Sequence, residues 1–86
     1  MNNKVLIKLI VPATGKKYDI FIPVNELVWK INKLIVKAIS DLEDGIINPR
    51  NKYVFVNKTN NKIYESNEII IDTDIRNGTE LVLVKV

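Results

Sequence analysis

The sequence lacks the two residue types that most often carry catalysis and metal binding, since it contains no Cys and no His. Their absence removes thiolate nucleophiles, the usual zinc ligands and the commonest general base near neutral pH. Ser40 and Ser66 therefore have no base that could activate a hydroxyl as a nucleophile. We expect a protein that is not an enzyme and that uses no cofactor.

Acidic residues gather at two places that could in principle hold a cation. Three of them lie between positions 41 and 44, just before Gly45, but their spacing differs from that of a calcium loop and no bidentate Glu closes it. Asp72 and Asp74 could hold magnesium, although capping a turn is the simpler interpretation. We predict a solvated helix end at the first place, a turn at the second, and no bound metal.

The charge pattern gives little support to nucleic-acid binding. The chain has 13 Lys and Arg against 10 Asp and Glu, a net charge of +3, and its basic residues are scattered rather than clustered. Tyr53 and Phe55, two apart on an expected strand, could stack on bases. The basic and glycine context of such RNA-binding sheets is missing, so we interpret both as core residues and expect no nucleic-acid partner.

The spacing of apolar residues predicts the strands and the helix that must position any site. Residues 5–11 and 17–22 alternate with a period of two and are joined by a short loop that contains Gly15, which predicts a hairpin. Pro23 ends the second strand. Residues 53–56, a short segment at 62–64 and residues 81–86 predict further strands. Residues 69–72 predict a compact turn or one helical turn, and Asn77-Gly78 predicts another turn.

Between these strands the period changes to three and four, which predicts one helix over residues 25–44. Asn25 is the expected N-cap, and Gly45 is the expected stop. Val24 and Trp29 occupy the positions of a hydrophobic staple; the alternative is that Trp29 is an exposed anchor for a partner. The expected buried face consists of Val28, Ile31, Ile35, Ala38 and Leu42, with Leu27 and Leu34 alongside.

One helix can cover only one face of the sheet, and the face left over is apolar. A solvated sheet normally presents polar side chains outward, and a large exposed apolar patch usually marks an interaction site. The alternative is that β-branched residues are simply good strand formers. We predict a protein-binding surface formed by Leu6, Ile10, Val54, Val56, Val82 and Val84, with Phe21 on the same side.

The order of elements resembles that of ubiquitin. Thr14-Gly15-Lys16 lies at the first hairpin, Pro23 precedes the helix, and residues 74–84 (DIRNGTELVLV) resemble the approach to the last strand of ubiquitin. Residues 17–23 (KYDIFIP), the following helix and residues 71–81 (IDTDIRNGTEL) are similar to the YukD/EsaB family, the small ubiquitin-like components of type VII (ESX-type) secretion systems of Gram-positive bacteria. The turn at residues 58–61 is wider than in that family.

This resemblance implies an α+β, ubiquitin-like β-grasp: a mixed sheet of four to five strands with one main helix packed on one face. We expect a single domain over residues 1–86, in which the first and last strands pair in parallel at the centre of the sheet. The near-continuous apolar character of the last strand suits that central position.

The family implies a cytoplasmic accessory or core component that acts through protein contacts. Its expected partners are cytosolic domains of the secretion machinery, with self-association as an alternative. The chain has neither an apolar stretch of about 20 residues nor a signal-peptide pattern, so we expect no direct membrane insertion. Other possible functions are a ubiquitin-like modifier or sulfur carrier, disfavoured because no Gly-Gly follows the last strand, and a generic β-grasp regulatory domain.

Overall fold

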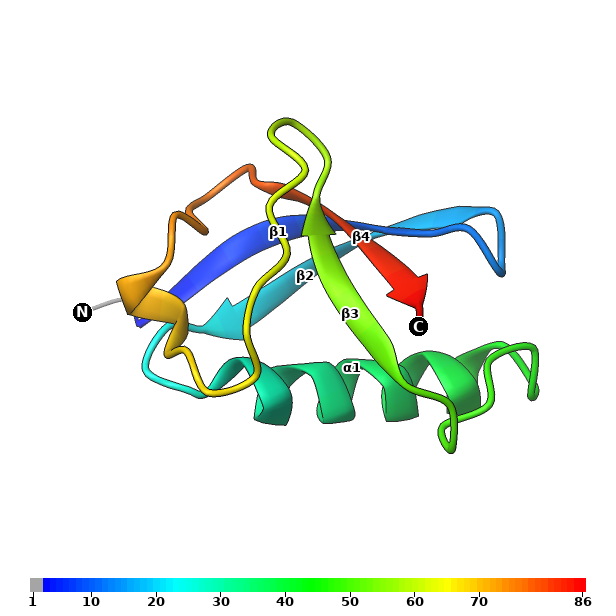
Figure 1. The fold of residues 1–86 in the computed structure, drawn as a ribbon. Coiled ribbons are helices and arrows are strands. Elements are labelled where there is room, and N and C mark those ends of the chain that lie inside the picture. Colours follow the sequence, from blue (N-terminus) through cyan, green and yellow to red (C-terminus); the bar gives the residue numbers. More distant parts are fainter. Residues whose placement is uncertain (1–2) are drawn as a thin grey trace.

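The computed structural model describes residues 3–86 and contains the expected order of elements (Figure 1). These elements are β1 (Lys4–Val11), β2 (Lys16–Pro23), α1 (Val28–Leu42), β3 (Tyr53–Asn57), the 3-10 turn η1 (Ile70–Asp72) and β4 (Glu80–Lys85). The strand order is β2-β1-β4-β3, with β1 and β4 parallel at the centre and both outer pairs antiparallel. The predicted β-grasp topology is therefore confirmed.

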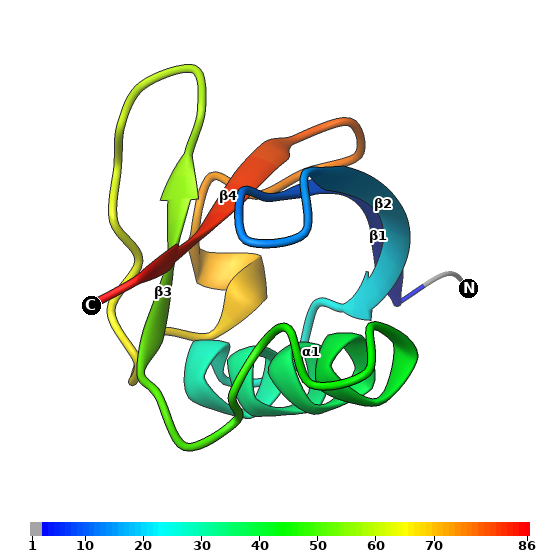
Figure 2. The same cartoon turned by 90° about the vertical axis from the view of Figure 1, so that its right-hand side faces the viewer.

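Helix α1 lies across one face of the sheet, with β3 and β2 at its two edges (Figure 2). Strand alternation decides which side chains the helix covers. Ile7, Leu9, Ile22, Phe55, Leu81 and Leu83 are buried on that face, and Val5, Ile20 and Tyr53 pack against the same core. The predicted inner face of the sheet is confirmed, and Tyr53 and Phe55 are core residues as expected.

The buried stripe of α1 is rotated from the predicted one. Val28, Ile31 and Ile35 are buried as expected, but the remaining buried positions are Val36 and Ile39. Ala38 and Leu42 are exposed instead. Apolar residues occupy more than half of the helix circumference, so the period alone does not select the side that the sheet and the segment before β3 enclose.

The predicted start of α1 is wrong. The helix begins at Val28, its N-cap is Leu27, and no side chain caps it. The first amides are satisfied by backbone carbonyls from a distant segment instead: Val28 N donates to Glu68 O at 2.8 Å and Trp29 N donates to Ser66 O at 3.1 Å. A helix end can use any acceptor that satisfies its free N–H groups, so Asn25 is not needed as a cap.

The predicted staple is wrong as well. Trp29 lies only two positions after the N-cap and is 49% exposed. At the other end the helix stops at Leu42, where Asp44 and Gly45 turn into the left-handed region with φ of 54° and 85°. The acidic residues between positions 41 and 44 therefore lie at a helix end, as predicted, but they are not all solvated, because the Glu43 side chain is only 10% exposed.

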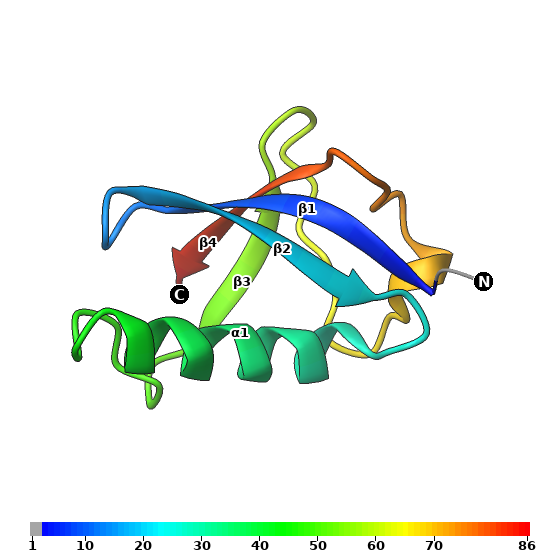
Figure 3. The same cartoon turned by 180° about the vertical axis from the view of Figure 1, so that it is seen from behind.

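The segment at residues 62–64 is not a full strand of the sheet. It makes one isolated bridge, between Val56 and Ile63, so the sheet has the lower of the expected strand numbers, four. Near the start of β1, η1 packs against the connection between β2 and α1 (Figure 3), where Ile70 N donates to Glu26 O at 3.0 Å. No helix in the described part of the chain is both long and apolar enough to cross a membrane.

Candidate functional site

Five of the six predicted site residues lie together on the sheet face opposite α1. Ile10, Val82 and Val56 are direct cross-strand neighbours in one row, and Val54 and Val84 form the next row. Side chains in such positions stand about 5 Å apart and form a continuous surface. We call these five residues the outer patch. Val84 is 38% exposed, and the other four are half-buried.

Leu6, the sixth predicted residue, is on the same face but outside the outer patch. Lys8 separates it from Ile10 along β1, and its cross-strand partner is Phe21 of the edge strand β2. Leu6 is 36% exposed. Its backbone N–H donates to the Asn77 side-chain oxygen at 2.8 Å, which fastens the loop before β4 to β1.

Ile63 extends the outer patch and was missed in the sequence interpretation. Its bridge to Val56 places it beside that row, and it is 59% exposed. The alternation expected at residues 62–64 was the available signal, because a residue opposite Val56 shares its face of the sheet.

Charged side chains border the outer patch. Lys8 lies in register with Asp19 on one neighbouring strand and Glu80 on the other, and Lys58 pairs with Glu80 at 3.9 Å. An apolar centre with a polar rim is the usual anatomy of a protein interface.

The acidic residues considered as metal ligands have partners of their own. Glu43 pairs with Lys16 at 3.0 Å and accepts the Tyr18 hydroxyl at 2.8 Å. The hydrogen bonds from Lys16 and then Tyr18 hold the pKa of Glu43 below its usual value, and the Glu43 carboxylate raises the pKa of Lys16. These contacts fasten the end of α1 to the first hairpin.

The second acidic place contains a buried tyrosine. The Tyr64 hydroxyl donates to Asp74 Oδ1 at 2.5 Å and accepts Asn57 Nδ2 at 3.0 Å. Burial, followed by the hydrogen bond to Asp74, raises the pKa of Tyr64 to about 12. The same hydrogen bond lowers the pKa of Asp74. At neutral pH this tyrosine is a neutral donor that anchors the loop after β3. Over residues 3–86, no three His, Cys, Asp or Glu residues come close enough to hold a metal ion.

No protein-family model matches the chain, and no curated protein matches it. Solved structures do. The EccD5 ubiquitin-like domain from Mycobacterium xenopi superposes with a TM-score of 0.77 at 9% identity, over 99% of this chain and 97% of that one. The ubiquitin-like domain of Plasmodium falciparum Dsk2 gives a TM-score of 0.73 at 17% identity, over 96% and 99%.

The chain has the ubiquitin-like β-grasp fold. A segment of one chain of the MycP5-free ESX-5 inner membrane complex, State II, is also similar, with a TM-score of 0.77 at 13% identity. That match covers 99% of the present chain but only 21% of the ESX-5 chain. Identities this low establish the ubiquitin-like fold alone, so function must be argued from the surface of this chain.

Proposed function

We propose that this ubiquitin-like domain is a non-enzymatic, protein-binding component of a type VII (ESX-type) secretion system that acts on the cytoplasmic side. The observation that carries the proposal is the outer patch, an apolar surface on the one sheet face that α1 does not cover. The resemblance to the YukD/EsaB family, together with the fold shared with EccD5 and the ESX-5 chain, favours this system as the setting.

The apolar area that stays exposed in the outer patch is what a partner would bury. Fully burying a Val or Ile side chain contributes about 1.5–3 kcal/mol. The outer patch is half-buried in the isolated chain, so a partner gains a part of that amount at each position, and the more exposed Val84 and Ile63 gain most. Association costs several kcal/mol in lost freedom, so two or three such residues decide whether a complex forms.

The test is binding to the cytosolic domains of an ESX inner membrane complex, measured by titration calorimetry with purified proteins. Val84→Asp places a charge in the outer patch and should weaken binding at least about tenfold, a loss of about 1.4 kcal/mol. Leu34→Asp makes a similar change at an exposed position of α1, on the side of the sheet opposite the outer patch, and should leave binding intact. Circular dichroism checks that both variants fold.

Three results would count against the proposal. The Val84→Asp variant could bind as tightly as the parent chain, the Leu34→Asp control could lose as much affinity, or no ESX domain could bind at all. Sedimentation analysis separates a further case: if the parent chain dimerises and Val84→Asp abolishes the dimer, the outer patch serves a second copy instead.

A further inference from the structure

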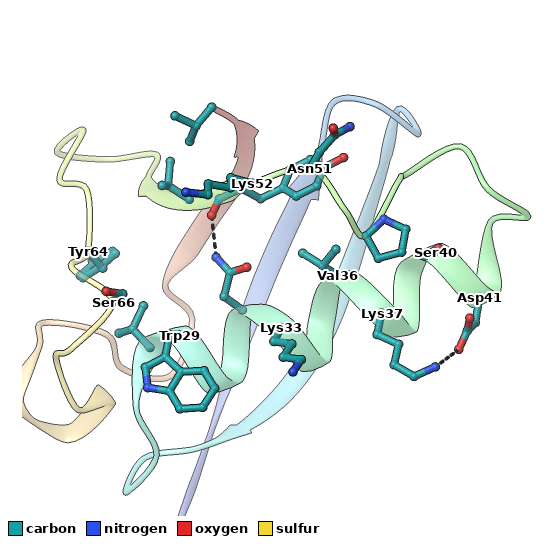
Figure 4. A pocket seen from close by; sticks show the side chains of 16 residues that line it. Trp29, Lys33, Val36, Lys37, Ser40, Asp41, Asn51, Lys52, Tyr64 and Ser66 are labelled. Atoms are coloured by element: carbon teal, nitrogen blue, oxygen red, sulfur yellow. Dashed lines mark hydrogen bonds and ion pairs between the residues drawn. The ribbon is translucent and has the colours of Figure 1, made fainter.

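A second recessed surface lies between α1 and the segment that enters β3 (Figure 4). We call it the helix groove. It has a volume of about 810 Å³, which is large enough to hold several side chains of a bound segment. The helix contributes Trp29, Lys33 and Val36 to its lining, and the segment before β3 contributes Asn51 and Lys52.

The helix groove is fixed in shape by contacts beneath it. Asn32 Nδ2 donates to the backbone oxygen of Tyr53 at 2.9 Å and so ties α1 to the edge strand. Val28 and Val36 are buried under the opening. A site formed before binding loses less conformational freedom when a partner docks.

Two lysines flank the buried valines of the helix groove, and neither is paired with an acidic group in the described part of the chain. Lys33 comes from the helix wall and Lys52 from the opposite wall (Figure 4), and both are exposed. Neither makes an ion pair with any residue that the structure describes. The other charged side chains of the lining, Lys37 and Asp41, form an exposed ion pair at 3.3 Å. The helix groove therefore carries two free cations.

Trp29 lies at the end of the helix groove nearest Ser66 (Figure 4). It is half exposed although it is the largest side chain of the molecule. Its backbone N–H is held by Ser66 O, so the backbone that carries the ring is fixed. Exposed tryptophans set in a pocket are frequent anchors of protein interfaces, because they bury a large area at little entropic cost.

We propose that the helix groove binds an acidic segment of a partner protein, with carboxylates between Lys33 and Lys52 and an apolar side chain against Trp29. Complementary charge selects such a segment and speeds its encounter. A single-stranded nucleic acid is a poorer fit, because the lining contains no Arg and one exposed aromatic ring rather than a row of them.

This inference goes beyond the proposed function, because the helix groove and the outer patch are separate surfaces. They meet only at Val54, which lines the helix groove and also belongs to the outer patch. Val84 does not line the helix groove. Variants at Lys33 and Lys52 therefore test the groove while the outer patch stays intact.

Trp29 is the only tryptophan of the chain, so its fluorescence reports on the helix groove without a label. The probes are synthetic peptides that carry Asp and Glu around one Leu or Phe, and matched peptides in which Asn and Gln replace the acids. We expect the acidic peptides to change Trp29 emission in a saturable way, and salt to weaken the effect. The Lys33→Gln/Lys52→Gln double variant should bind roughly three- to tenfold more weakly.

The control is Lys4→Gln/Lys30→Gln, which removes the same charge from exposed positions outside both the helix groove and the outer patch and should bind like the parent chain. Equal binding of acidic and neutral peptides, equal losses in both double variants, or no emission change with any peptide would overturn the proposal. So would tighter binding of a single-stranded RNA or an anionic vesicle to the same site.

Discussion

Tyr64→Phe isolates the hydrogen bonds that anchor the loop after β3, because it removes one oxygen atom and keeps the ring. Tyr64 is buried, and its hydroxyl joins Asn57 to Asp74. Asp74 is exposed and also accepts Asn60 Nδ2, so it can return to water at little cost. Asn57 is only 7% exposed, so water cannot replace the Tyr64 hydroxyl, and its amide nitrogen would be left without an acceptor.

The expected loss is therefore the cost of one buried, unsatisfied donor, about 1–3 kcal/mol, plus a smaller contribution from the charge-assisted hydrogen bond to the exposed Asp74. In a domain of this size each kcal/mol lowers Tm by about 4–8 °C. Thermal and urea unfolding followed by circular dichroism measure the change. Tyr53→Phe is the matched control, since no residue between 3 and 86 forms a hydrogen bond with the Tyr53 hydroxyl, and it should cost under about 0.5 kcal/mol.

The pH dependence of stability tests the Tyr64→Phe prediction in a second way. The pKa of Asp74 is lowered in the folded state, chiefly by the Tyr64 hydroxyl. This contribution to stability is present above the unfolded-state pKa of about 3.9 and is lost as pH falls through the lower folded value. The difference between the parent and Tyr64→Phe should therefore shrink in acid. A pH-independent difference, or a loss no larger than that of Tyr53→Phe, would refute the reasoning.

Two further predictions concern contacts elsewhere in the chain. Gly45 has a φ of 85° and Asn61 a φ of 60°, both in the left-handed region. Gly45→Ala should therefore cost about 1 kcal/mol of stability in thermal unfolding, while Asn61→Gly should cost almost nothing. Equal losses would contradict the left-handed geometry. Glu43→Gln should return the raised pKa of Lys16 toward its ordinary value, because the Glu43 hydrogen bond is the main cause of the shift, and NMR titration of the Lys16 ammonium measures it. An unchanged Lys16 pKa would mean that the pair does not form in solution.

The parts of the fold that were predictable are those whose cause is local. The alternation in residues 5–11 and 53–56 follows directly from one buried and one uncovered sheet face, so it correctly separated Ile7 and Phe55 from Ile10 and Val54. The start of α1 was not predictable in this way. Its first amides bond to the carbonyls of Ser66 and Glu68, which lie almost forty residues further along the chain.

The two candidate sites also differ in whether local sequence or tertiary packing determines them. The outer patch was accessible from alternation alone, because every member is defined by its parity on a strand. The helix groove was not, because its walls come from α1 and from the segment before β3, and only packing brings Lys33 and Lys52 to the same groove. The exposure of Trp29 belongs with the helix groove, since it follows from a helix start that the local sequence does not encode.

Binding at the two proposed surfaces should respond to ionic strength in opposite ways, and this would separate their partners. Salt screens Lys33 and Lys52 and weakens binding in the helix groove, whereas an excluded salt such as sulfate strengthens burial of the apolar outer patch. Val54→Asp reaches both surfaces, but Val84→Asp reaches only the outer patch. A partner whose binding is weakened by Val84→Asp and strengthened by sulfate therefore occupies the outer patch. A partner whose binding is weakened by Lys33→Gln/Lys52→Gln and by added salt occupies the helix groove. A partner that fails both tests but responds to Val54→Asp must span the two surfaces where they meet.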